Sequence, residues 1–327
     1  MYNPSGTQRL EATVPRDIVY ALLGMASDRA ELGIDPDYTC TYAQFCTNTT
    51  KALIVQDINM LLRLNCQGPN TLSHDLPSWA IDWAAPFQRT LIPSDPKYEA
   101  AVGTQARVRF IDDETGPVLV ISAINVGTVL VNEHAIDSKT CLVKPKGWPG
   151  RGRIRPTTRS LTVILQVEKA ARLTMVIKSA YATCQERREA VWATATTGLR
   201  MVQGTGPRRA TAEESHAYSS AGLKSDMRRL SSFRGRSDFS HTSRISAAKY
   251  ATEQKFFFVT MRGRLGLGTE DIKAGDLVCV ALGLHMPIIL RSTGNGCYRL
   301  VGNAYVHGIM NSEALGKGGA ATEMCII

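Results

Sequence analysis

The pattern of apolar and polar positions predicts helices in the first hundred residues. Residues 15–27, PRDIVYALLGMAS, begin with Pro15, which suits a first helical turn, and with Asp17, whose charge the helix dipole favours there. The apolar side chains of this stretch recur at helical spacing and form one face: Ile18, Val19, Leu22 and Leu23. A second, longer helix is expected over about residues 40–64, before a loop with turn residues at 65–79.

From about residue 107 the pattern changes to that of β-strands. The runs are short, apolar and rich in β-branched residues: 107–112, 117–131, 255–260, 277–283, 286–291 and 298–310. Turns separate them, such as DDETG at 112–116, which predicts a hairpin, and STGNG at 292–296. Short strands at this spacing favour a small antiparallel β-barrel or sandwich.

Residues 134–254 interrupt the strand pattern. Helical segments are expected within 161–199, whereas the basic, Ser-rich stretch near 205–250 has few aliphatic side chains and is expected to be disordered. The predicted fold class is therefore α+β, with a helical section packed on a split β-module that flanks a helical, partly disordered insertion. The boundaries of these parts are residues 1–100, residues 101–133 plus 255–327, and residues 134–254, in that order.

Composition indicates a folded chain without a membrane span. The 327 residues are 44% hydrophobic and 20% charged, which is enough apolar material for a sizeable core. No run of 18 uncharged apolar residues occurs, and the first residues lack the apolar segment of a signal peptide, so we expect a cytoplasmic protein. None of the eight cysteines has CxxC spacing, which favours buried, reduced thiols.

The net charge of +9 and the pI of about 9.2 could indicate nucleic-acid binding. Much of the excess lies in two stretches, 151–159 and 224–249. Few aromatic side chains are interleaved with these basic residues, so they give little support to stacking on single strands. Nucleic-acid binding is therefore the weakest of the function hypotheses.

The sequence contains no P-loop, dinucleotide-binding fingerprint, HExxH or GxSxG motif. GRLGLG at 263–268 superficially matches a glycine-rich dinucleotide-binding pattern, but it lies between two predicted strands rather than between a strand and a helix. A tight bend that needs positive φ explains its glycines. The six histidines show no metal-ligand spacing, so neither a cofactor nor a metal ion is expected.

Candidates for acid–base chemistry lie in the last predicted strand and the turn before an earlier one. Tyr305 and His307 alternate along a strand, share one face and could contact a small molecule. Asp276 could orient His307 or His285 as a general base. In the structural interpretation, which we favour, Tyr305 and His307 satisfy backbone groups or each other, and Asp276 caps the turn.

The block LPSWAIDW offers a second set of candidates. Trp79 and Trp83 could line an apolar substrate pocket in which Asp82 is the polar group. Alternatively, the two indole rings hold the helical section against the β-module. The sequence leaves both interpretations open.

Several blocks, in their order along the chain, resemble the fungal heterokaryon-incompatibility (HET-domain) family: PRDIVYALLGMAS, IDPDYT, LPSWAIDW, FFVTMRGRLGLG, AGDLVCVALGLHMPIILR and YRLVGNAYVHGIMNSEAL. In that family an Arg-Asp-x-Val-Tyr-Ala-Leu-Leu-Gly helix precedes a Pro-Asp-Tyr turn and a Leu-Pro-Ser-Trp-x-x-Asp-Trp block. The family's defining N-terminal block, with its Tyr-x-x-Leu-Ser-Tyr-x-Trp-Gly strand, does not occur here. The chain is therefore expected to match the region that follows that block.

The resemblance implies a role in fungal non-self recognition or programmed cell death, which we expect to depend on a protein partner rather than on catalysis. The alternative is an enzyme of fungal secondary-metabolite biosynthesis that acts on a small molecule. Its pocket would lie between the helices and the β-module, near Trp79, Asp82, Tyr305 and His307.

Overall fold

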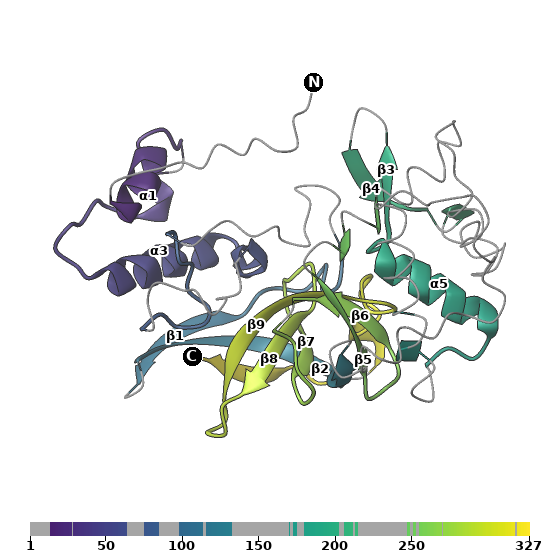
Figure 1. Ribbon diagram of the computed structural model, residues 1–327. Helices are drawn as coiled ribbons and strands as arrows, with labels where there is room; N and C mark the ends of the chain where they lie inside the picture. Colours follow the sequence, from purple (N-terminus) through teal and green to yellow (C-terminus); the bar gives the residue numbers. More distant parts are fainter. Residues whose placement is uncertain are drawn as a thin grey trace, which may run out of the picture.

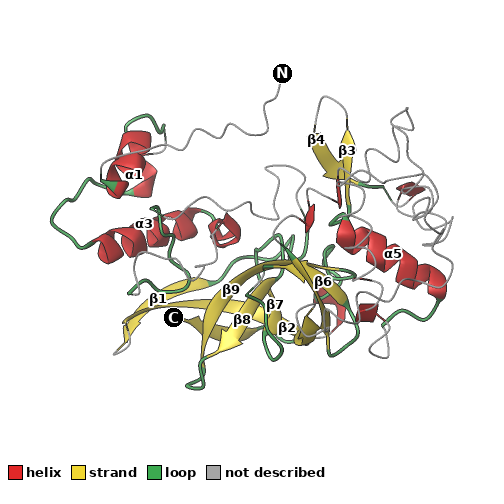
Figure 2. Cartoon of the chain, viewed as in Figure 1, coloured by secondary structure: helices red, strands yellow, loops and turns green. Residues whose placement is uncertain are grey.

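The computed structural model (Figure 1) describes residues 14–27, 29–63, 75–84, 98–113, 116–132, 170, 173–174, 180–202, 206–211, 213–214, 247–248, 251–252, 255–269, 271–317 and 319–327. It combines few helices with a large, mainly antiparallel sheet, which confirms the α+β class. Figure 2 shows α1 and α3 beside one end of the sheet and α5 beside the other. None of the helices in the described ranges is both long and apolar enough to cross a bilayer.

The N-terminal section consists of α1 (Pro15–Leu23), α2 (Arg29–Leu32), α3 (Tyr42–Gln56) and the 3-10 helix η1 (Ile58–Arg63). Thr41 begins α3 with a capping box. Its hydroxyl accepts a hydrogen bond from the backbone N–H of Gln44, and the side-chain oxygen of Gln44 accepts one from the backbone N–H of Thr41. The single helix predicted over 40–64 is wrong. Asp57 takes an extended conformation, φ −147° and ψ 109°, and its carboxylate binds Asn59, so the chain continues as a 3-10 helix.

Eight strands form the main sheet: β1 (Val108–Asp113), β2 (Gly116–Asn132), β5 (Phe256–Thr260), β6 (Leu265–Gly268), β7 (Leu277–Ala281), β8 (Ile288–Ser292), β9 (Cys297–Val306) and β10 (Thr322–Ile326). Their order is β1-β2-β5-β6-β9-β8-β7, and β7 pairs again with β2, which curls the sheet into a barrel-like module. β10, which the sequence did not predict, pairs with β2 and with the start of β9. β6 lies within GRLGLG, where the sequence predicted a bend, and the remaining strands lie where the apolar runs predicted them.

The long strand β2 holds the two parts of the sheet together. Its first half pairs with β1 and β10, its middle with β7 and its last residues with β5. Leu119, Ile121 and Ala123 point into the core shared with the helices, whereas Ile124 and Val126 point into a second cluster. Both faces are buried, which explains why the strand reads as a nearly continuous apolar run.

The glycines of GRLGLG are explained by backbone geometry and close packing. Gly263 adopts φ 74° in the turn between β5 and β6, as the predicted bend requires. Gly266 lies under the ring of Phe258, where a Cβ atom would come within 2.3 Å of a ring carbon. No side chain fits there, so the stretch serves the fold of the hairpin.

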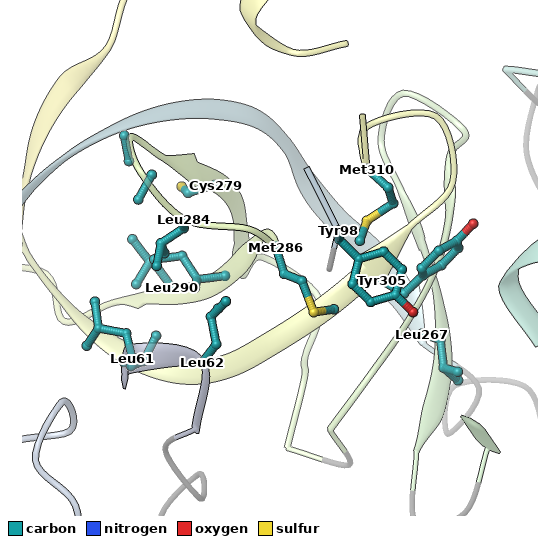
Figure 3. Close-up of a cluster of buried hydrophobic side chains, with 14 of the residues drawn as sticks. Leu61, Leu62, Tyr98, Leu267, Cys279, Leu284, Met286, Leu290, Tyr305 and Met310 are labelled. Carbon is teal, nitrogen blue, oxygen red and sulfur yellow. The ribbon is translucent and has the colours of Figure 1, made fainter. Parts of the chain in front are cut away.

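The main core joins the helices to one face of the sheet. Figure 3 shows Leu61 and Leu62 of η1 among Met286, Leu290 and other buried side chains from the strands. Such burial contributes about 1.5–3 kcal/mol for each large apolar side chain. The helical section is therefore held to the β-module by shared apolar burial.

The described part of the insertion contains α5 (Cys184–Ala195) and a hairpin of β3 (Leu199–Val202) and β4 (Gly206–Arg209). The sequence predicted helix within 161–199 but not this hairpin, and β4 occupies the first residues of the stretch expected to be disordered near 205–250. Glu214 fixes the hairpin, because its carboxylate pairs with Arg200 and Arg208. Most of the other residues of that stretch lie outside the described ranges.

Candidate functional site

Tyr305, near the end of β9, points into the packed core. Its side chain is 5% exposed, and its ring lies edge to face with Tyr98, with 6.0 Å between ring centroids (Figure 3). Its hydroxyl lies beside Gly198, where a Cβ atom would be 3.4 Å away. Burial raises the pKa of Tyr305, so the phenol stays protonated.

His307 directly follows β9, in the turn after the strand, and is half-buried, so the strand predicted over 298–310 ends before it. Its backbone N–H donates to the carbonyl of Leu265, and its ring lies edge to face with Tyr181 at 5.4 Å between centroids. The Nδ1 atom is buried and has no hydrogen-bond partner among the residues the structure describes. Burial, and then the neighbouring guanidinium of Arg264, lowers the pKa of His307, so the imidazole is neutral at pH 7.

Both carboxylate oxygens of Asp276 accept hydrogen bonds from neighbouring groups. Its two carboxylate oxygens accept from Nε of Arg291 at 2.8 Å and from a terminal guanidinium nitrogen at 2.9 Å. One of them also accepts from the backbone N–H of Lys273 at 2.8 Å. The bond with Asp276 raises the pKa of Arg291. This bidentate pair fixes the turn before β7, and neither His307 nor His285 shares it.

Asp82 lies in a second buried polar cluster, against α3. Its Oδ1 accepts from the Tyr42 hydroxyl at 2.9 Å and from the backbone N–H of Ala84 at 3.0 Å. Burial raises the pKa of Tyr42, and it raises the pKa of the Cys46 thiol to about 11. The other oxygen, Oδ2, is buried and lacks a partner among the described residues. Asp82 is thus a buried carboxylate with half of its acceptor capacity in use.

The two tryptophans of the LPSWAIDW block have separate surroundings. Trp79 is completely buried, its Nε1 donates to the carbonyl of Pro117 on β2, and its ring packs on Phe110 of β1. Trp83 is half-buried beside the Asp82 cluster, and its Nε1 has no partner in the described part of the chain. Trp79 therefore attaches the helical section to the sheet, while Trp83 belongs to the Asp82 cluster.

A cavity of about 440 Å³ lies between the end of α3 and the β-module. Its wall includes Gln56, Asp57, Asn59, Thr104 and Gly283. Several of these polar groups bind one another: Asn59 donates to Asp57 and to the Gly283 carbonyl, and Thr104 accepts from the Gly283 N–H. The volume is that of a small-ligand site, but none of the six candidate side chains lines it.

The structure therefore does not gather the candidate residues into one site. Tyr305 and His307 lie near the α5 end of the sheet, Asp276 binds Arg291, and Asp82 lies beside α3. Sequence reasoning missed Tyr42, Cys46 and Arg291. Only the i, i+4 spacing of Tyr42 and Cys46 could have signalled one shared helix face. Within the described ranges, no group of three His, Cys, Asp or Glu side chains could hold a metal ion.

Comparison with known proteins gives two matches. Residues 209–318 match the Het-6 β-barrel domain family, and the matched region includes β5 to β9. The chain is also 26% identical over 345 aligned positions to "Heterokaryon incompatibility protein 6, OR allele" of Neurospora crassa. That alignment covers 92% of this chain and 49% of the relative, so the chain spans about half the length of that protein. No solved structure matches.

Proposed function

From the similarity to the Het-6 β-barrel domain and to Heterokaryon incompatibility protein 6, we propose that the chain belongs to the fungal heterokaryon-incompatibility family and acts in heterokaryon incompatibility through contacts with another protein. The observation that carries the proposal is the similarity to Heterokaryon incompatibility protein 6 along 92% of this chain. The similarity spans the helical section, the β-module and the insertion together. The role proposed here is recognition of a non-self partner or transmission of a cell-death signal.

The surroundings of the candidate residues support contacts rather than catalysis. Asp276 is neutralised by Arg291, and the Tyr305 phenol is buried in a packed core. A general base has to reach the proton that it abstracts, and it works best with a pKa near the operating pH. Burial lowers the pKa of His307 and leaves its ring against Tyr181, away from the one cavity described above.

The alternative, an enzyme of secondary metabolism, has one supporting observation. The cavity beside α3 lies between the helices and the β-module, where the alternative places its pocket, and it has a suitable volume. Its polar wall groups are already paired with each other. A substrate there would meet few free donors and acceptors, so this alternative is the weaker proposal.

A pairing assay tests the proposed function. A fungal strain that carries the gene and a sister strain from which it has been deleted are each fused with tester strains of different genetic background. We expect at least one tester to give inviable or slow-growing fusion cells only with the gene-bearing strain. Equal growth of both strains with every tester would contradict the proposal.

The proposed mechanism needs a second measurement in the same fusion cells. The epitope-tagged full chain is captured after chemical crosslinking, in compatible and incompatible fusions. A protein crosslinked to described surface residues only in the incompatible fusion would support recognition by contact. Incompatibility without any crosslinked protein, together with loss of the phenotype on disruption of the cavity wall by Gly283→Trp, would favour the enzyme alternative.

A further inference from the structure

Two thiols face each other across the junction of β9 and β10. The two strands run parallel there, and Cys325 is the register partner of Cys297. Residues paired in this way on neighbouring strands point to the same face of a sheet. Both cysteines are free and partly exposed, and Cys297 directly follows an exposed turn, residues 292–296. A small solute can therefore approach the pair from the side of that turn.

The spacing of the strands brings the thiols within reach of a bond. Paired strands lie about 4.8 Å apart, and a disulfide joins Cα atoms about 4.4–6.8 Å apart. The Cβ atoms of a disulfide are about 3.8 Å apart, so the two side chains must lean toward each other. β10 is joined to β9 by only two register pairs, Cys325 with Cys297 and Ile326 with Tyr298, and this short ladder can adjust.

We propose that Cys297 and Cys325 form an oxidation site, at which a hydroperoxide converts two thiols into one disulfide. The Cys297 thiolate attacks the terminal oxygen of the hydroperoxide, the O–O bond breaks, and the leaving alkoxide or hydroxide takes up a proton. The Cys325 thiolate then attacks the sulfenic sulfur of Cys297, the S–O bond breaks, and hydroxide leaves as water. In sum, two thiols and one hydroperoxide give a disulfide, an alcohol or water, and one further water.

The disulfide would tie the last strand to the barrel-like module. β10 contributes the buried side chains Met324 and Ile326 to the core, so its detachment would expose apolar surface. A covalent link to β9 makes that detachment rarer. Burial, and then the proximity of Cys325, raises the pKa of Cys297. The thiolate is the nucleophile, so oxidation should become faster as the pH rises.

This oxidation site does not depend on the proposed role in incompatibility, and each can fail without the other. The test treats the purified full chain with hydrogen peroxide under native conditions, blocks the remaining thiols and identifies crosslinked peptides by mass spectrometry. We expect one peptide pair, joined through Cys297 and Cys325, with the loss of two hydrogen atoms. In Cys325→Ser a sulfenic-acid probe should label Cys297 instead.

Matched variants separate this site from general thiol oxidation. Cys184 is exposed on α5, so Cys184→Ser should leave the crosslink unchanged, whereas Cys297→Ser should abolish it. Hydrogen exchange of β10 should slow at least several-fold in the oxidised chain. Disulfides that join other cysteines or two chains, or further oxidation of Cys297 to sulfinic acid while Cys325 stays reduced, would overturn the proposal.

Discussion

Asp276 in the β-module and Asp82 in the helical section are both buried carboxylates, but their surroundings differ. The two carboxylate oxygens of Asp276 accept hydrogen bonds from the Arg291 guanidinium and from the backbone N–H of Lys273. One oxygen of Asp82 accepts hydrogen bonds from the Tyr42 hydroxyl and from the backbone N–H of Ala84. The other oxygen has no partner among the described residues. A buried charge is costly unless it is paired, so the two positions contribute to stability in opposite ways.

The comparison shows what burial alone cannot decide. Asp276 was a candidate because it could orient a histidine as a general base, and Asp82 because it could be the polar group of an apolar pocket. Asp276 turns out to fix a turn of the sheet. Asp82 has the unsatisfied acceptor that a functional group needs, but it stands beside Tyr42 and Cys46, whose pKa values burial raises. Because their pKa values are raised, the Tyr42 phenol and the Cys46 thiol stay protonated at neutral pH, so neither of them supplies a nucleophile beside Asp82.

The largest effect is expected at the paired carboxylate. Asp276→Ala leaves Arg291 without its partner and the Lys273 N–H unsatisfied, and should lower the free energy of unfolding by about 3 kcal/mol. Urea denaturation of the purified chain measures this. The double variant Asp276→Ala with Arg291→Met should recover part of the loss. A loss below about 0.5 kcal/mol would mean that the pair is not structural.

A third carboxylate, Glu214, extends the comparison to a more accessible position. Its pKa is lowered from 4.5 to about 2, first by the bond from Arg208. The folded-state pKa is depressed, so the stabilisation is present above pH 5 and is lost as the pH falls from about 4.5 to about 2. We expect a contribution of about 1 kcal/mol, since solvent screens the pair. Acid titration of the thermal midpoint, with Glu214→Gln as the reference, should show the two proteins converging near pH 2.

At the half-paired carboxylate we expect a smaller effect of the opposite sign. Asp82→Asn keeps an acceptor for Tyr42 and Ala84 and removes a buried charge that lacks a full set of partners. The variant should be as stable as the original chain or more stable by up to about 1 kcal/mol. Denaturation beside Asp276→Asn gives the contrast. A strong destabilisation of Asp82→Asn would show that Oδ2 has a partner.

The smallest effect is expected at exposed ion pairs. Lys51 and Asp112 approach to 3.5 Å, with the Asp112 side chain 80% exposed, and Arg109 pairs with Glu323 in the open. Lys51→Ala and Arg109→Ala should each change stability by less than about 0.5 kcal/mol. Both variants serve as controls in the same denaturation series. A change in the free energy of unfolding above about 1 kcal/mol would mean that the Lys51 or Arg109 side chain contributes to packing.

The sequence predicted those parts of the fold that depend on local pattern. Apolar runs and turn residues located strands such as β7 and β8, and the ordered blocks pointed to the family that the comparisons support. The break at Asp57 was missed because the apolar positions continue at helical spacing into η1. β10 was missed because five residues after a glycine-rich stretch carry little periodic signal.

The partners of the candidate residues could not be predicted, because they come from distant segments. Asp276 finds Arg291 across a hairpin, Asp82 finds Tyr42 forty residues earlier, and Tyr305 packs on Tyr98 from another part of the chain. Side-chain spacing along a strand shows that Tyr305 and His307 share a face. It does not show whether that face meets a cavity or a core. The tertiary structure supplies that information for Tyr305.

We propose that this chain works by contact with another protein and that its buried polar residues serve the fold. The most direct measurement is the strain-pairing assay with the double variant His307→Gln and Asp82→Asn, after circular dichroism has shown that the variant folds. We expect incompatibility equal to that of the unaltered gene. Loss of incompatibility in a folded, normally abundant variant would contradict it and would return these two residues to a chemical role.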